Sequence, residues 1–199
     1  MVRVIAFSGP VASGKSTILE SIYKLLSVSH SVHIIREYID VLPDANDKLT
    51  AYLNNQLSAY AFQNYILDYF DASSKLDNDY DYVLVERCPM EGLKFFARLD
   101  VKNKRMTEDE YQKLIDRASS MTYYPNPDNC KNILKINTDD MLPDGITGLV
   151  YDFINDVDII QLIAKPMTIK QRIIQRGRIA EINAYDDKYL NYMCGMYYK

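Results

Sequence analysis

The sequence has few of the residues that build disulfide scaffolds and zinc sites. Only three of its 199 residues are cysteines, two are histidines, and tryptophan is absent. Because Cys88, Cys130 and Cys194 are few and odd in number, a disulfide framework is not expected and a reducing compartment fits better. The cysteines lack metal-ligand spacing, and both histidines lie far from them in sequence, which argues against a zinc site.

Long apolar runs and an excess of positive charge are also missing. No apolar stretch reaches the roughly 18 residues of a membrane span, so no membrane partner is expected. Lys and Arg total 23 against 27 Asp and Glu, whereas general nucleic-acid binders are usually basic, so no nucleic-acid partner is expected either. The sequence opens directly on a strand-like segment, so no signal or transit peptide is expected. We therefore expect a cytoplasmic protein, in the host cytoplasm if the chain is viral.

What is present is an alternation of strand-like and helix-like segments. Apolar runs at 2–7, 32–36, 82–85 and 158–164 predict strands, and a short further strand is expected at 133–136 within an otherwise irregular stretch, 123–149. Amphipathic spacing predicts helices over 15–28, 48–70, 107–120, 168–180 and 186–198, with Thr107 and Thr168 as N-caps. The alternation predicts a parallel sheet covered on both faces, in one α/β domain spanning 1–199.

The first helix is preceded by a complete phosphate-loop motif, G-x-x-x-x-G-K-[ST], over residues 9–16. In this motif backbone N–H groups cradle phosphate, the lysine charge meets the β- and γ-phosphates, and the hydroxyl after it binds Mg²⁺. The sequence therefore predicts ATP with Mg²⁺ as cofactor. The expected ATP-binding residues of the loop are Gly9, Pro10, Val11, Ala12, Ser13, Gly14, Lys15, Ser16 and Thr17.

Charged residues follow the predicted strands at the point where each one ends. Glu37 comes after the second strand, and Glu86 with Arg87 comes after the third. Ligands bind beyond the carboxyl ends of the strands in such a sheet, so these side chains should converge near the phosphate loop. A carboxylate there can accept a proton from an attacking hydroxyl, and an arginine can hold an oxygen of the acceptor or of a phosphate.

A basic helix near the end of the chain carries arginines on one face. Arg172 and Arg176 are four residues apart, and Arg178 follows shortly after. A hinged arginine helix can close over ATP and neutralise charge on the transferring phosphoryl group. We expect this lid to span about 168–182.

Together these features resemble the deoxynucleoside kinases, the family that includes cellular and viral thymidine kinases of the non-zinc type. The resemblance covers roughly 1–120 and 155–199. It is carried by the phosphate loop, Glu37, Phe62-Gln63, Glu86-Arg87-Cys88 and an R-x-x-x-R-x-R-x-x-E run that ends at Glu181. It implies a P-loop NTPase-like, three-layer α/β/α fold with a doubly wound parallel sheet, an arginine-rich lid and a homodimer.

The resemblance also implies the reaction and a role for each matching residue. ATP would give its γ-phosphoryl group to the 5′-hydroxyl of a deoxynucleoside, whose proton Glu37 would take. Arg87 would hold the 5′ oxygen, and Glu86 would reach Mg²⁺ through water beside Ser16. The expected catalytic residues are Glu37, Arg87, Lys15, Arg172, Arg176 and Arg178, with Arg176 and Arg178 also binding ATP. The expected substrate-binding residues are Glu37, Tyr52, Phe62, Gln63, Arg87, Phe96 and Glu181: Gln63 for the base edge, Phe96 and Phe62 for its face, Tyr52 and Glu181 for the 3′-hydroxyl.

The sequence departs from the family pattern at several positions. Tyr38 replaces the usual proline after the catalytic glutamate, Cys88 replaces a serine, and Leu42 stands near the place of a tryptophan. The usual final strand and loop near adenine do not follow the last helix. Members that favour deoxycytidine or purines place Arg and Asp where Phe70 and Gly92 stand here, so thymidine or another pyrimidine deoxynucleoside is the expected substrate.

Two other functions remain open from the sequence. A nucleoside monophosphate kinase of the thymidylate kinase type shares the phosphate loop, an Arg-Glu pair after the second strand and an arginine lid, but usually carries Asp-Arg where this chain has Glu86-Arg87. A non-catalytic nucleotide-binding module is the second alternative, and the presence of Lys15, Glu37 and Arg87 argues against it. A switch GTPase would need a guanine-reading N-K-x-D motif, and the sequence contains none.

Overall fold

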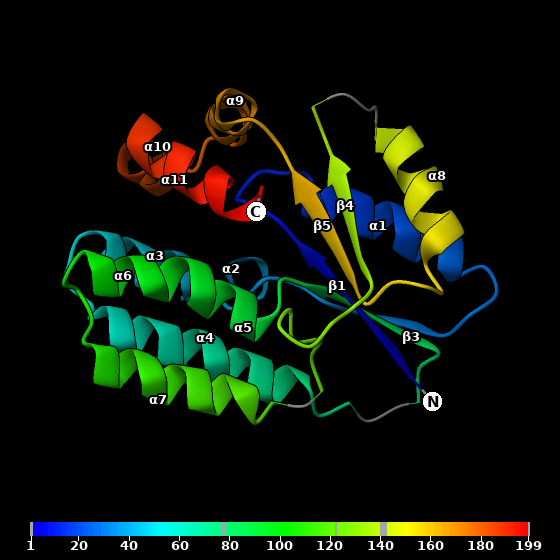
Figure 1. Cartoon of the computed structure of the whole chain (residues 1–199), viewed down its shortest axis with the longest axis horizontal. Coiled ribbons are helices and arrows are strands. Elements are labelled where there is room, and N and C mark those ends of the chain that lie inside the picture. Colours follow the sequence, from blue (N-terminus) through cyan, green and yellow to red (C-terminus); the bar gives the residue numbers. More distant parts are fainter. Residues whose placement is uncertain (1, 77–78, 122, 140–142, 199) are drawn as a thin grey trace.

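The computed structural model describes residues 2–76, 79–121, 123–139 and 143–198, and a parallel β-sheet forms its centre (Figure 1). Five strands follow the order β2-β3-β1-β5-β4, and every neighbouring pair runs parallel. They are β1 (Arg3–Ser8), β2 (Val32–Ile35), β3 (Tyr82–Glu86), β4 (Ile133–Asn137) and β5 (Ile159–Ile163). The sheet confirms the expected α/β class, and the predicted strand at 133–136 is present as β4.

Alternate residues of the central strands face two separate cores. Ile5 and Phe7 of β1 pack with α1 (Lys15–Leu26) and α8 (Pro143–Phe153), whereas Ala6 packs with α4 (Ala59–Ser73) on the other face. Figure 1 shows α1 and α8 on one side of the sheet and α4 on the other. Because both faces are covered by helices, the central strands are apolar throughout rather than alternating.

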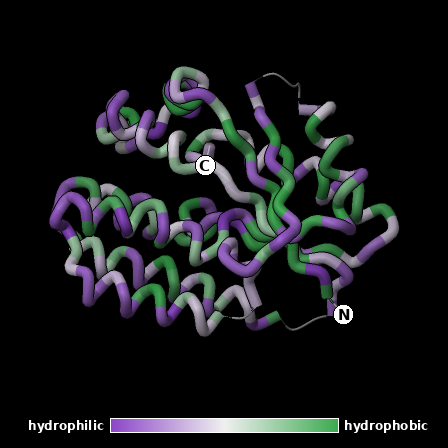
Figure 2. The backbone as a smooth tube through the Cα atoms, viewed as in Figure 1, coloured by the Kyte–Doolittle hydropathy of each residue, from purple (hydrophilic) through white to green (hydrophobic). Residues whose placement is uncertain are grey.

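The remaining helices lie around these layers (Figure 1). They are α2 (Tyr38–Val41), α3 (Ala45–Leu53), α5 (Pro89–Gly92), the π-helical segment η1 (Leu93–Ala97), α6 (Arg98–Lys102), α7 (Glu108–Ser119), α9 (Pro166–Arg176), α10 (Ile179–Ala184) and α11 (Asp187–Tyr197). Helix α7 begins with the predicted capping box between Thr107 and Glu110. In Figure 2 the outer helices alternate between hydrophilic and hydrophobic colours. Within the described ranges, no helix combines the length and apolar content needed to cross a bilayer.

The single helix predicted over 48–70 is wrong, because the chain forms α3 and α4 with a break between them. Helix α3 ends at Leu53, and Asn55 adopts a left-handed conformation with φ 58°. Asparagine tolerates this conformation better than most residues. Ser58 then caps α4 by accepting a hydrogen bond from the Ala61 amide at 3.2 Å. Apolar residues continue at helical spacing across the break, so the sequence pattern predicted one continuous helix.

The irregular stretch predicted over 123–149 is also partly wrong, since α8 occupies its end. Pro143 is the first residue of α8, where its missing N–H removes no helix hydrogen bond. Ile146, Val150 and Ile154 then repeat at helical spacing and are buried against the core that contains α1. Proline and glycine are typical of loops, so the composition of this stretch did not predict the helix.

The lid region consists of two helices rather than one helix over 168–180. Helix α9 begins at Pro166 with Lys165 as its N-cap, so the expected cap at Thr168 is wrong. It ends at Gly177, whose φ of 73° is the left-handed conformation that glycine adopts readily at helix ends. Helix α10 follows, and Asp186 then caps α11 by accepting from the Tyr189 amide.

Candidate active site

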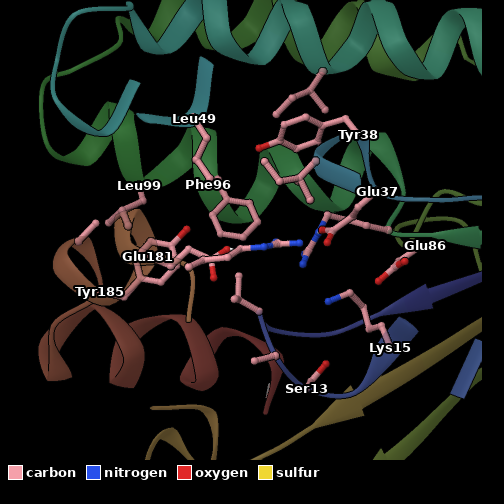
Figure 3. Close-up of a pocket in the computed structure, with 18 of the residues that line it drawn as sticks. Ser13, Lys15, Glu37, Tyr38, Leu49, Glu86, Phe96, Leu99, Glu181 and Tyr185 are labelled. Carbon is pink, nitrogen blue, oxygen red and sulfur yellow. Dashed lines mark hydrogen bonds and ion pairs between the residues drawn. The ribbon is translucent and has the colours of Figure 1, made fainter. Parts of the chain in front are cut away.

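The register of the sheet brings the charged residues after β2 and β3 next to the phosphate loop after β1. Ile35 pairs with Val85, so Glu37 lies level with Arg87 just past the strand ends. Phe7 pairs with Glu86, and the Arg87 amide donates to the Phe7 carbonyl at 3.0 Å. Figure 3 shows Glu37, Glu86 and Lys15 around one end of a cavity of about 920 Å³.

The phosphate loop begins with a glycine that no other residue could replace without displacing the neighbouring backbone. Gly9 has a φ of 146°, and a Cβ added to it would lie 2.4 Å from the Leu162 carbonyl oxygen. Lys15 is buried and its ammonium donates to the carbonyls of Gly9 and Pro10 at 3.3 and 3.0 Å. Burial and the nearby Arg87 charge lower the pKa of Lys15. An anion in the loop would therefore stabilise the charged lysine.

Ser16 and Glu86 form a hydroxyl–carboxylate pair beside the loop. The Ser16 hydroxyl donates to Glu86 Oε1 at 2.6 Å. Burial, together with the negative charge of Glu37, raises the pKa of the Glu86 carboxyl. Among the described residues no group of three acidic, histidine or cysteine side chains could enclose a metal ion. A Mg²⁺ ion fits this pair only as Mg²⁺ usually binds, with one carboxylate, waters and the substrate phosphates.

Glu37 and Arg87 form a short, shielded ion pair. Arg87 Nε donates to Glu37 Oε1 at 2.6 Å, and the two side chains are 8% and 19% exposed. Burial of the Glu37 carboxyl opposes its ionisation, but the charges of Arg87 and Lys15 and the hydrogen bond outweigh burial and lower its pKa to about 2. The carboxylate is therefore ionised at neutral pH and able to accept a hydrogen bond or a proton.

The three arginines expected in the lid differ in their partners. Arg172 is fixed to the loop and the end of β4, since Nη1 donates to the Ser13 carbonyl at 3.3 Å and Nη2 to the Thr138 carbonyl at 3.1 Å. Arg176 is paired with Glu181. Arg178 Nη2 lies 2.5 Å from Asp40 Oδ1. Arg172 thus anchors the lid to the phosphate loop, whereas the other two are held by carboxylates.

The far end of the cavity is aromatic, and one of its tyrosines is held by a buried acid. Tyr52 stacks on Phe62 with ring centres 4.4 Å apart, and its hydroxyl lies 2.8 Å from Asp100 Oδ2. Arg105 lies over the Tyr52 ring at 4.3 Å and also contacts Asp100. Because the Tyr52 hydroxyl gives its single proton to Asp100, its oxygen is left as an acceptor.

Nearly all the residues expected in the site line the same cavity. They are Val11, Ala12, Ser13, Gly14, Lys15, Ser16, Thr17, Glu37, Tyr52, Phe62, Gln63, Glu86, Arg87, Phe96, Arg172, Arg176, Arg178 and Glu181. Gly9 and Pro10 do not line the cavity, but their carbonyls accept hydrogen bonds from the Lys15 ammonium. The replacements Tyr38 and Cys88 line the cavity as well.

Several residues of the site were not found from the sequence. Asp100 and Arg105 belong to segments that carry no motif, and they meet Tyr52 across about fifty residues of chain. Glu91 lies four residues after Arg87, a spacing that favours an ion pair on a helix. Its Oε1 accepts a hydrogen bond from Arg87 Nη1 at 3.0 Å. The last group comes from the end of the chain: Tyr185, Tyr189 and Tyr192 line the cavity, and Tyr197 contacts Arg87 behind it.

Comparisons with known protein sequences and structures bear on the family and the fold of this chain. Comparison with curated protein sequences gives no significant match. Among solved structures, the deoxyadenosine kinase from M. mycoides with bound dATP is similar to this chain, with a TM-score of 0.64 and 19% sequence identity over 98% of this chain and 82% of that one. At that identity the likeness establishes the fold alone. The family model for deoxynucleoside kinases matches residues 5–143, and the chain therefore belongs to the deoxynucleoside kinase family.

Proposed function

We propose that the protein transfers the γ-phosphoryl group of ATP to the 5′-hydroxyl of a deoxynucleoside. The observation that carries the proposal is the Glu37–Arg87 pair, which borders the same cavity as Lys15 and the phosphate loop (Figure 3). An acceptor hydroxyl bound beside Glu37 would lie between that carboxylate and a triphosphate held by the loop. Such placement supports transfer mainly through positioning and charge stabilisation, since the transition state of phosphoryl transfer is loose.

Each charged residue then has a defined task. Glu37 accepts the hydrogen bond of the 5′-hydroxyl and takes its proton, while Arg87 holds the acceptor oxygen. Lys15 neutralises the β- and γ-phosphates, and Arg176 and Arg178 exchange their carboxylate partners for phosphate oxygens when ATP binds. Bound Mg²⁺ would supply charge neutralisation on the phosphates, held through Ser16 and, by way of water, Glu86.

We further propose that the preferred acceptor is thymidine or another pyrimidine deoxynucleoside. Gln63 is 3% exposed and lines the cavity, where its amide offers both a donor and an acceptor to a base edge. Phe96 and Phe62 supply apolar faces for stacking. Phe70 and Gly92 also line the cavity and carry no charge, so the Arg and Asp of members that favour deoxycytidine or purines have no counterpart there.

A monophosphate acceptor fits the site less well. A phosphate beside Glu37 would need a free cation, yet Arg87 is already paired with both Glu37 and Glu91. The Glu37 carboxylate itself would repel the dianion. A nucleoside hydroxyl carries no such charge and needs only the hydrogen bonds that this pair offers.

Product analysis tests the proposal directly. The purified protein is incubated with Mg²⁺ and ATP and with each of the four deoxynucleosides, then with the matching monophosphates. We expect thymidine to give its monophosphate at the highest kcat/KM. Diphosphate formed from a monophosphate would favour the thymidylate kinase alternative, and a higher kcat/KM for deoxyadenosine or deoxyguanosine would overturn the pyrimidine assignment. ATP binding with no phosphorylated acceptor in the panel would favour a non-catalytic module.

A further inference from the structure

A buried carboxylate, Glu91, lies behind the site and belongs to none of the motifs found in the sequence. Its side chain is 1% exposed. The single oxygen Oε1 accepts from three donors that come from three parts of the chain: the Gly9 amide at 3.2 Å, Arg87 Nη1 at 3.0 Å and the Tyr197 hydroxyl at 2.7 Å. One atom thus connects the first residue of the phosphate loop with the arginine on the acceptor side of the cavity.

Tyr197 completes this connection from the last helix. Its hydroxyl accepts from Arg87 Nη1 at 2.9 Å and donates to Glu91, so the three side chains form a closed triangle. The tyrosine is fully buried, its ring centre lies 4.2 Å from that of Phe95, and its carbonyl accepts from Gln161 Nε2 at 3.2 Å. The position of its hydroxyl is therefore set by the contact of the ring with Phe95 and by the backbone.

The nitrogens of the Arg87 guanidinium differ in their partners. Nε is bound to Glu37, and Nη1 is shared between Glu91 and Tyr197. Nη2 is buried and has no hydrogen-bond partner in the described part of the chain. The Arg87 backbone is fixed as well, since its φ of 68° is an uncommon conformation for a residue other than glycine and its amide is bound to Phe7.

We propose that Glu91 and Tyr197 are positioning residues for phosphoryl transfer, which hold Arg87 and the Gly9 end of the phosphate loop in one fixed arrangement. The inference rests on the proposed function. Glu91 and Tyr197 touch neither substrate; they act through Arg87 and Gly9, so that the acceptor oxygen and the triphosphate meet at a set distance. Displacing reacting groups by about 1 Å can lower the rate about 100-fold. A positioning role therefore predicts a loss in kcat that exceeds any change in KM.

Tyr197→Phe is the sharper of two test variants, because it removes only the hydroxyl and keeps the ring against Phe95. We expect kcat to fall about 10-fold and the KM values for nucleoside and ATP to change less than kcat. Glu91→Gln should lower kcat about 10- to 100-fold, since it removes the charge that faces Arg87. Tyr151→Phe and Glu108→Gln are matched controls on exposed surfaces and should leave kcat unchanged.

A combination with Arg87→Met separates positioning from general stabilisation. If Tyr197 acts through Arg87, Tyr197→Phe causes no further loss of kcat in the Arg87→Met background. An equal loss in both backgrounds, an unchanged kcat in Tyr197→Phe, or a loss explained by unfolding at the assay temperature would each overturn the inference. The activity of the parent protein tests the proposed function separately. If the parent phosphorylates no acceptor, both the proposed function and this inference are rejected. If the parent is active and the variants are as active as the parent, only this inference is rejected.

Discussion

Replacing Arg87 with methionine should strongly destabilise the protein, because the buried Glu91 and the partly buried Glu37 lose their common partner. The guanidinium is 8% exposed and donates to Glu37 at 2.6 Å and to Glu91 at 3.0 Å. Removing one partner of a buried ion pair costs about 3–5 kcal/mol. A chain of about 150–250 residues loses about 2–4 °C of Tm for each kcal/mol, so Tm should fall by about 6–20 °C.

The assay is thermal unfolding by calorimetry, with urea unfolding as a second measure of the free energy. Adding Glu91→Gln to Arg87→Met should restore part of the lost stability, since the neutral amide removes the unpaired charge that the first change leaves. A loss of Tm below about 2 °C for Arg87→Met would refute the reasoning, because it would mean that the pair contributes less than about 1 kcal/mol. A double variant less stable than the single one would refute it also.

Three further predictions concern other parts of the site. Gly9→Ala should abolish ATP binding in a nucleotide titration, because its Cβ would lie 2.4 Å from the Leu162 carbonyl; unchanged binding would contradict the close packing described. Since burial and the Glu37 charge raise the pKa of Glu86, protons should compete with Mg²⁺ at a higher pH than for an ordinary glutamate. As the pH is lowered, the Mg²⁺ concentration for half-maximal rate should therefore begin to rise at a higher pH than an ordinary glutamate would give, in the parent but not in Glu86→Gln. Asp100→Asn should reduce the kcat/KM preference for a deoxynucleoside over its 3′-deoxy analogue, as the Tyr52 hydroxyl would no longer be fixed as an acceptor; an unchanged preference would exclude this role.

Much of the fold could be predicted because local signals and tertiary structure agree. Strand, loop and helix follow one another around the phosphate loop, and the buried parallel strands are mostly apolar. The break between α3 and α4 was missed because apolar spacing continued through it, and α8 was missed because its proline and glycines resemble a loop. Between α3 and α4 the Ser58 cap, and not hydrophobic periodicity, decides where the second helix begins.

That Lys15, Glu37, Glu86 and Arg87 line one cavity could be predicted, because each follows a strand or the glycine-rich turn after β1. Glu91 and Tyr197 could not be assigned, since their contact spans more than one hundred residues and depends on how α11 packs against the sheet. The same holds for Asp100, whose contact with Tyr52 arises only once α6 and α3 are side by side. Such residues hold the motif residues in place, and, apart from the spacing of Glu91 and Arg87, no local pattern marks them.

The most direct measurement of the central claim is the kcat of Glu37→Gln with thymidine, ATP and Mg²⁺. Glutamine keeps the size of the side chain but cannot take the proton of the acceptor hydroxyl. Because the pKa of Glu37 is lowered to about 2, the parent carboxylate is ionised at any pH where the protein is assayed, and its loss should lower kcat about 100-fold or more. The dissociation constant for ATP should stay close to that of the parent. A Glu37→Gln variant that phosphorylates thymidine as fast as the parent would contradict the account.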